Sequence, residues 1–106
     1  MSYRFMRILV MFDLPIVTNH DRKEYTKFRK HLLKSGFLML QESVYCKLVP
    51  NSTMADALIE NLRKNKPPKG LVQALKITEK QFERMEYLVG EYQSEVVDTD
   101  ARLIIL

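Results

Sequence analysis

The chain has 106 residues, of which 46% are hydrophobic and 28% charged, and its formal net charge is +4. This length fits one domain, and the hydrophobic fraction excludes a disordered or collagen-like chain. No apolar run approaches the roughly 20 residues that span a bilayer, and the single cysteine, Cys46, excludes an internal disulfide and a cysteine-rich metal site. We therefore expect a soluble cytoplasmic protein with no membrane association.

The charges are distributed unevenly along the chain. Residues 1–76 contain fourteen Lys/Arg and six Asp/Glu, a balance of +8, whereas residues 77–106 contain three Lys/Arg and seven Asp/Glu, a balance of −4. A basic body suggests a polyanionic partner such as nucleic acid. An asymmetry of this size is also common in small proteins, so it does not decide the question alone.

The first predicted elements are a strand and a helix. Residues 8–12 form a continuous apolar run, typical of a central strand, which Pro15 stops because proline donates no ladder hydrogen bond. Thr18 and Asp21 have the spacing of a capping box, so a helix should follow and end at Gly36 in the left-handed conformation.

The middle of the chain predicts two more strands and a second helix. Residues 37–49 are rich in strand formers and are interrupted at 41–43, which favours two strands joined by a tight turn over one bent strand. Thr53 and Asp56 repeat the capping pattern, and the helix cannot pass Pro67. The apolar stripes predicted for the two helices comprise Tyr25, Phe28, Leu32 and Leu33, and then Met54, Ala55, Leu58, Ile59 and Leu62.

A last strand and a short helix complete the main domain. Residues 71–78 are strand-like, and Thr78 with Gln81 can cap a third helix. The resulting βαββαβ order predicts an α+β, ferredoxin-like sandwich with its helices on one face of the sheet. A single uncovered sheet face of this size favours a homodimer that covers it.

We divide the chain into a ferredoxin-like domain, residues 1–90, and an acidic connector with an additional C-terminal strand, residues 91–106. The closing apolar segment, Arg102–Leu106, has no obvious place inside one copy. It can add to the sheet edge of the partner subunit or form an edge strand within its own subunit.

Asp13 is the acidic residue with the most suggestive position, since it directly follows the apolar strand. One interpretation is a turn aspartate that accepts backbone N–H bonds before Pro15. The other is a Mg²⁺ ligand, because Mg²⁺ prefers oxygen ligands and keeps several waters. A two-fold dimer would then supply two such carboxylates from one position.

The first predicted helix carries a cationic face. Its lysines at positions 23, 27, 30 and 34 are spaced four, three and four apart, and Arg22 lies beside the first of them. Like charges at this spacing repel each other, and cations in the first turn oppose the helix dipole. The face is either ordinary solvated surface or a binding site for phosphate oxygens.

Several motifs together resemble a known family. They are Phe12-Asp13-Leu14-Pro15, Gly36-Phe37 followed by Gln41-Glu42-Ser43-Val44-Tyr45, Pro67-Pro68-Lys69-Gly70, Thr78-Glu79-Lys80-Gln81-Phe82 and Asp100 to Leu103. In order and spacing the sequence is similar to the small core CRISPR-associated adaptation protein, the second CRISPR-associated protein, usually described as an endoribonuclease. The resemblance runs from about residue 4 to the end and is greatest to the version found with a single large RNA-guided effector nuclease.

The resemblance implies a homodimer with exchanged C-terminal strands that bridges two dimers of the CRISPR-associated integrase and holds double-stranded prespacer DNA. It also implies Mg²⁺-dependent nuclease activity on single-stranded RNA or double-stranded DNA, with Asp13 as the catalytic and metal residue. The family's basic residues at the start of the first helix fall on Arg22 and Lys23; Lys27 and Lys30 extend that surface. The family's strand-motif serine falls on Ser43, at the dimer interface or near a phosphate.

The chain departs from the family pattern at two positions. Phe12 replaces a tyrosine of many members, which removes a hydroxyl near any metal, and Glu42 replaces a frequent aromatic residue. Two functions from different classes remain: a subunit for CRISPR spacer acquisition that contributes shape and phosphate contacts, and a metal-dependent endonuclease that cleaves phosphodiesters through paired Asp13 carboxylates. We favour the first as the cellular role.

Overall fold

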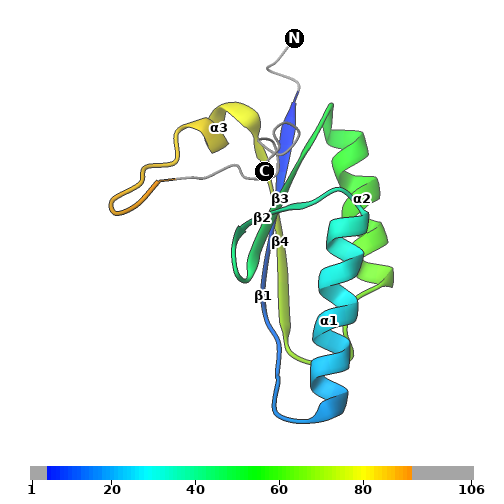
Figure 1. Ribbon diagram of the computed structural model, residues 1–106. Helices are drawn as coiled ribbons and strands as arrows, with labels where there is room; N and C mark the ends of the chain where they lie inside the picture. The colour runs from blue at the N-terminus through cyan, green and yellow to red at the C-terminus, as the bar shows by residue number, and fades with distance from the viewer. Residues whose placement is uncertain (1–4, 92–106) are drawn as a thin grey trace, which may run out of the picture.

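The computed structural model describes residues 5–91 and contains four strands and three helices within them (Figure 1). In chain order they are β1 (Met6–Asp13), α1 (Asn19–Lys34), β2 (Leu38–Gln41), β3 (Val44–Val49), α2 (Ser52–Lys64), β4 (Leu71–Thr78) and α3 (Glu79–Glu83). The predicted acidic connector, from residue 92 on, and the predicted strand at Arg102–Leu106 lie outside the described residues.

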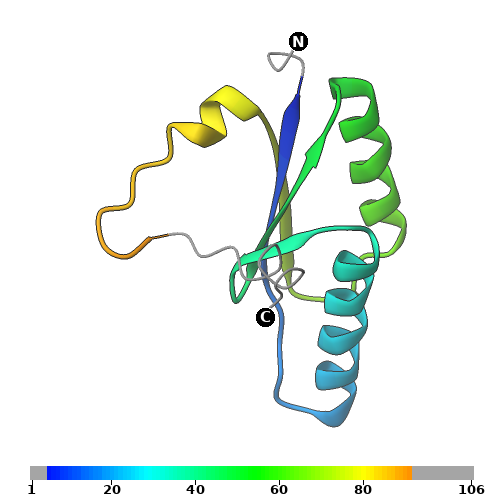
Figure 2. The same ribbon diagram turned by 45° about the horizontal axis from the view of Figure 1, so that its top comes forward.

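The four strands form one antiparallel sheet in the order β2-β3-β1-β4. Helices α1 and α2 lie side by side on one face, whereas α3 lies on the other side of the sheet (Figures 1 and 2). This arrangement confirms the predicted α+β, ferredoxin-like fold. No helix among residues 5–91 is long and apolar enough to cross a membrane.

The core lies between the sheet and the two long helices. Alternate side chains of β1 point to the same face, and those of Ile8, Val10 and Phe12 are buried there. The Phe12 ring meets Phe28 edge-to-face at 5.4 Å between centroids and stacks on Tyr45 at 5.7 Å. The position where many relatives were expected to carry a tyrosine therefore faces the core, on the opposite side of β1 from Asp13.

The other face of the sheet is lined by the alternate set of side chains. Leu9 of β1 lies opposite Leu75 of β4, and Arg7 lies opposite Leu48 of β3. Several of these side chains are exposed in the single copy: Leu48 is 41% exposed, Leu71 54% and Leu75 49%. We call this surface the open face.

Most predicted boundaries are confirmed. Thr18 and Asp21 form a reciprocal capping box at the start of α1, and Thr78 and Gln81 form another at α3. Gly36 has a φ of +92°, as expected for the residue that ends α1. Strands β2 and β3 are separate and are joined by a turn at Glu42 and Ser43, so the one-strand interpretation is wrong.

Two details of the helices differ from the prediction. Helix α2 begins at Ser52 and is capped by Asn51, whose side chain accepts a hydrogen bond from the Met54 backbone N–H at 2.8 Å, so the predicted cap at Thr53 is wrong. Leu33 and Met54 were predicted to face the sheet but are 43% and 51% exposed. The buried apolar residues are instead Phe28 and Leu32 in α1 and Ala55 and Leu62 in α2.

Helix α3 is fixed to the start of β1 by a charged contact. The Arg7 guanidinium donates to both carboxylate oxygens of Glu79, at 2.8 and 2.6 Å, and its carbon lies 4.2 Å from the centre of the Phe82 ring. The Glu79 backbone N–H also donates to the Phe5 carbonyl at 3.0 Å. These contacts hold the chain that leaves β4 on the side of the sheet away from α1 and α2.

Candidate functional site

Asp13 is the last residue of β1, and its side chain belongs to the open face. It is exposed, and its carboxylate makes no hydrogen bond or ion pair with any other residue in the range 5–91. The interpretation of Asp13 as a turn aspartate that accepts backbone N–H bonds therefore finds no support among these residues. Its oxygens are available to a ligand.

Two other segments meet β1 at this end of the sheet. Leu71, the first residue of β4, pairs with Asp13 in the antiparallel ladder. The Phe12 backbone N–H donates to the Ser43 carbonyl at 3.1 Å, which brings the turn between β2 and β3 beside the end of β1. The structure thus places Ser43 and Asp13 at one end of the sheet, although they are thirty residues apart in sequence.

The loop between Asp13 and α1 is held by the helix cap. The Asp21 carboxylate accepts from the Thr18 backbone N–H at 3.1 Å, and the Thr18 hydroxyl accepts from the Asp21 N–H at 3.0 Å. Asp21 is only 5% exposed, and Lys69 Nζ lies 3.7 Å from its Oδ1. The hydrogen bond from Thr18, followed by the attraction of Lys69, outweighs burial and lowers the pKa of the Asp21 carboxyl.

One copy supplies only a single carboxylate at Asp13, which is fewer protein ligands than a complete Mg²⁺ site would need. No group of three His, Cys, Asp or Glu side chains in residues 5–91 is close enough to hold a metal ion. One unpaired carboxylate at the end of a strand is nevertheless a suitable ligand for an ion that keeps several waters. A complete site would need the equivalent carboxylate from a second copy.

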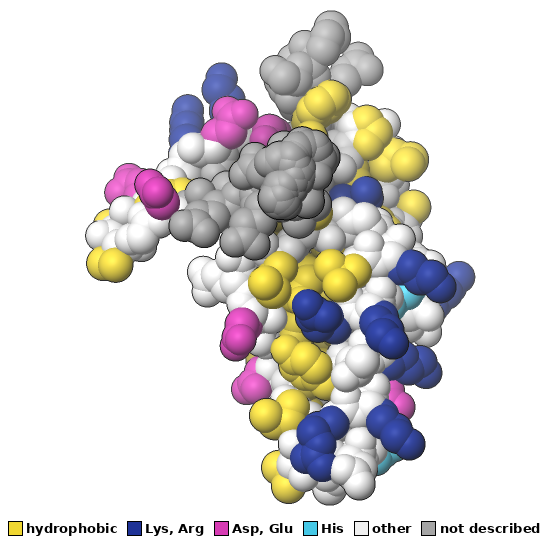
Figure 3. Space-filling model, in the orientation of Figure 1, with side chains coloured by type: hydrophobic (Ala, Val, Ile, Leu, Met, Phe, Trp, Pro, Cys, Tyr) yellow, Lys and Arg dark blue, Asp and Glu magenta, His cyan; other side chains and the backbone are white. Residues whose placement is uncertain are grey.

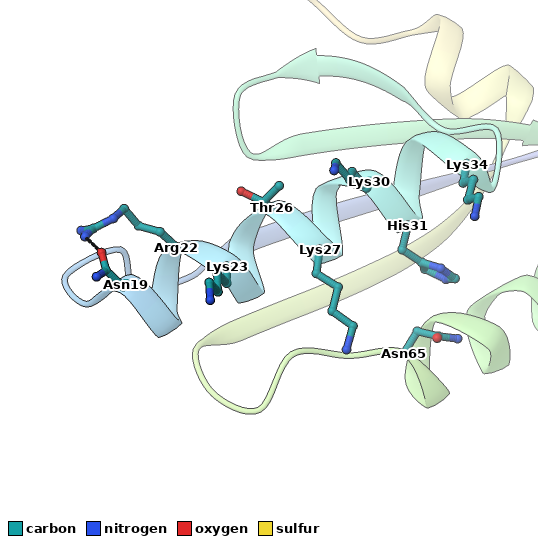
Figure 4. A pocket seen from close by; sticks show the side chains of 9 residues that line it. All are labelled: Asn19, Arg22, Lys23, Thr26, Lys27, Lys30, His31, Lys34 and Asn65. Carbon is teal, nitrogen blue, oxygen red and sulfur yellow. Dashed lines mark hydrogen bonds between the residues drawn. The ribbon is translucent and has the colours of Figure 1, made fainter.

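The predicted basic residues line a groove along α1. The groove has a volume of about 760 Å³, and the side chains that line it are those of Asn19, Arg22, Lys23, Thr26, Lys27, Lys30, His31, Lys34 and Asn65. All belong to α1 except Asn65, which follows α2 (Figure 4). We call this surface the α1 groove. Figure 3 shows Lys and Arg side chains gathered over the part of the molecule that contains α1.

The four lysines and Arg22 differ in how they are engaged. The lysines make no ion pair with any described residue. Arg22, in contrast, donates to the carbonyls of Ile16 and Val17 at 3.1 and 3.0 Å and to the Asn19 side chain, so its guanidinium braces the loop after Asp13. Asp21 and Glu24 of the same helix offset the mutual repulsion of the lysines in part, but neither forms an ion pair with them.

Other polar groups extend the α1 groove, and they were not among the predicted site residues. His31 Nε2 lies 3.0 Å from Asn61 Oδ1, which ties α1 to α2, and Asn19, Thr26 and Asn65 add hydrogen-bonding groups between the cations. Asn19 and Thr26 lie at helical spacing from the lysines and could have been found from sequence. The contribution of Asn65 depends on how α2 packs beside α1.

Comparison with known proteins identifies the family. The model of the family described as CRISPR associated protein Cas2 matches residues 6–85. The chain is a member of the Cas2 family. It is 52% identical over 101 residues to the CRISPR-associated endoribonuclease Cas2 of Treponema denticola, covering 95% of this chain and 100% of that protein.

Two further Cas2 relatives give the same result. The CRISPR-associated endoribonuclease Cas2 of Streptococcus mutans is 48% identical, covering 95% of this chain and 93% of that protein. The protein of the same name from Ligilactobacillus salivarius is 44% identical, covering 95% of this chain and 100% of that protein. The resemblance noted from the short motifs is therefore confirmed as membership of the Cas2 family.

Proposed function

We propose that this Cas2 protein is a nucleic-acid-binding subunit for CRISPR spacer acquisition. In this proposal a homodimer bridges two dimers of the CRISPR-associated integrase and binds double-stranded prespacer DNA along the α1 groove. The observation that carries the proposal is the row of lysines on α1, none of which forms an ion pair with a described residue. Phosphate oxygens would relieve their repulsion, and release of counterions would add to the affinity.

The open face supports the dimer in this proposal. Exposed leucines of β3 and β4 lie beside half-buried apolar residues of β1 on a surface that neither α1 nor α2 covers. A second copy packed on this face would bury them and bring two Asp13 side chains to one two-fold axis. We further propose that Arg102–Leu106 adds to a sheet edge of the partner subunit. Deletion of Arg102–Leu106 should then weaken the dimer or the integrase complex, and normal assembly would contradict this assignment.

The salt dependence of duplex binding tests the α1 groove. The double variant Lys23→Gln/Lys27→Gln should weaken binding and reduce the slope of log affinity against log salt by about 1 for each lost phosphate contact. Lys30→Gln should add to the effect. The matched control, Lys80→Gln/Arg84→Gln, removes the same charge from α3 and its end, on the other side of the sheet, and should leave the slope nearly unchanged. Equal effects of the two pairs would show that only net charge matters.

A second candidate function is cleavage of RNA or DNA, favoured by the unpartnered Asp13 and by the endoribonuclease names of the relatives. In this proposal the two Asp13 carboxylates of a dimer hold Mg²⁺, which when bound would polarise the phosphodiester and ionise a water. The contribution of this chain is to place the carboxylates rigidly at the ends of two strands and to align the phosphate backbone through the lysines. No group of three His, Cys, Asp or Glu side chains among residues 5–91 could hold a metal ion, so one copy alone does not provide a complete cleavage site, which favours slow cleavage.

Asp13→Asn separates the two functions. The substitution removes charge but keeps the size of a side chain that makes no hydrogen bond in the described structure, so the fold should survive. Spacer insertion by a variant that has lost cleavage would assign the cellular role to binding alone. Loss of both activities, with duplex affinity unchanged, would favour the enzymatic role.

A further inference from the structure

The loop that follows Asp13 packs against the loop that precedes β4. Gly70, in that second loop, has a φ of +100°, a conformation that side chains rarely adopt. A Cβ atom at this position would lie 2.9 Å from the Asp13 carbonyl oxygen and 2.7 Å from Leu14 Cδ2. Both are closer than real Cβ contacts, and one involves backbone, so the absence of a side chain at Gly70 lets the two loops meet.

Lys69 makes the second contact between these loops. Its Nζ lies 3.7 Å from the buried Asp21 carboxylate, which caps α1 at the other end of the Asp13 loop. Gly70 therefore contacts the start of the loop between β1 and α1, and Lys69 contacts its end. Arg22 donates hydrogen bonds to two carbonyls in the middle of that loop. Together these contacts leave the backbone around Asp13 few alternative positions.

We propose that Gly70 and Lys69 are positioning residues that set the orientation of the Asp13 carboxylate for a divalent cation. This inference rests on the proposed role of Asp13 as a metal ligand in the dimer. Two carboxylates that share one ion tolerate little displacement, because Mg²⁺ demands near-ideal octahedral geometry. The groove lysines at positions 23, 27, 30 and 34 are not among the atoms that a Cβ at Gly70 would meet, so their charges should be unaffected.

Gly70→Ala tests this role, with Gly90→Ala as the matched control. Gly90 also has a positive φ, +83°, but a Cβ there would have no atom within 4 Å, so it introduces the same kind of backbone strain without the close contact. In the full chain, Mn²⁺ binding is measured by electron paramagnetic resonance, and amide hydrogen exchange is followed at positions 14, 16, 17 and 18. Gly70→Ala should weaken Mn²⁺ binding at least tenfold and speed exchange in this loop, with the salt slope of duplex binding unchanged. Gly90→Ala should change none of the three.

The outcomes distinguish this inference from the proposed site itself. Mn²⁺ binding that Asp13→Asn does not weaken would overturn Asp13 as a ligand and with it the positioning role. Binding that Asp13→Asn abolishes but Gly70→Ala leaves intact would overturn the positioning role alone. Unchanged exchange in Gly70→Ala would show that the loops adjust without moving Asp13 and would overturn it as well.

A second variant covers the case in which Gly70→Ala fails to fold. Lys69→Met removes the contact with Asp21 without backbone strain and should weaken Mn²⁺ binding by about two- to fivefold. Lys69→Arg, which keeps the charge, should restore it. Equal binding by the Met and Arg variants would show that the contact between Lys69 and Asp21 has no influence on Asp13.

Discussion

The two faces of the sheet come from the same strands but meet different surroundings. On the helix-covered face Ile8 and Val10 are fully buried, and aromatic rings pack around Phe12. On the open face Leu48 and Leu75 are close to half exposed. Alternate residues of β1 therefore have different roles. Those on the helix-covered face stabilise the single copy, and those on the open face are available to contact a second copy or a ligand.

Asp13 and Asp21 show a similar contrast between a residue that the fold engages and one that it leaves free to bind. Asp21 is buried, hydrogen-bonded and close to Lys69, as a residue with a structural role should be. Asp13, eight residues earlier, has none of these contacts among the described residues. The fold itself uses the charge of Asp21, whereas no described residue pairs with the charge of Asp13, which leaves Asp13 available to a ligand.

The largest expected effect is on the covered face. Phe28 is 2% exposed and meets Phe12 edge-to-face, so Phe28→Ala should lower the free energy of unfolding by about 3–5 kcal/mol. Urea unfolding at fixed protein concentration measures this loss. A loss below about 1 kcal/mol would mean that the helices contribute little to the stability of the sheet.

Leu75→Ala on the open face should act mainly through assembly. In a dilute single copy a half-exposed leucine contributes little, so unfolding should change by less than about 1 kcal/mol. The proposed dimer would bury this leucine from both copies, so the substitution would remove two buried side chains. The dissociation constant of the dimer should then rise about tenfold or more. Sedimentation equilibrium over a range of concentrations measures this. An unchanged constant would exclude the region around Leu75 from the interface.

Asp21→Asn should reveal a pH-dependent contribution to stability. Because the folded pKa of Asp21 is lowered, the unfolded chain takes up the proton first, and the stabilisation is present above the ordinary carboxyl pKa of about 4. It is lost as pH falls through the folded value. The wild type should therefore exceed the variant in melting temperature at pH 6–7, and the difference should shrink below pH 4. Asp13→Asn, the control, should leave the melting temperature at pH 7 within a degree or two.

The smallest expected effect concerns Tyr45. Its ring is fully buried, and its hydroxyl has no hydrogen-bond partner within the described part of the chain. A buried unpaired hydroxyl is costly, so Tyr45→Phe should leave stability unchanged or raise it by up to about 1 kcal/mol. Thermal unfolding measures the shift. A clear loss would indicate a hydrogen bond to a group such as an ordered water.

Local sequence signals predicted the bounds of an element correctly where only one nearby residue could start or end it. The apolar run of β1, the capping boxes at Thr18 and Thr78, and Gly36 each follow from short-range chemistry. The start of α2 was misplaced because Asn51, Ser52 and Thr53 can all cap a helix, and the spacing of Thr53 and Asp56 alone did not choose among them.

The candidate site was harder to predict because it depends on strand pairing. Asp13 and the lysines were visible from sequence, but their neighbours were not. Ser43 approaches through the pairing of β1 with β3, and Gly70 approaches through the pairing of β1 with β4. Arg22 donates to the carbonyls of the loop that precedes it. The sequence shows only its charge, which fits this structural role and phosphate binding equally well.

The charged contact between Arg7 and Glu79 allows fluorescent labels to be placed separately on the two sides of the sheet. Because it keeps α3 opposite α1 and α2, a fluorophore at position 29 of α1 and one at position 85, which follows α3, would report from opposite sides. Burial raises the pKa of the native Cys46 thiol, and the residue is only 1% exposed, so it should react far more slowly with maleimide than an exposed cysteine. Introduced cysteines can therefore be labelled selectively, and docking of a duplex can be distinguished from docking of a second subunit in one titration.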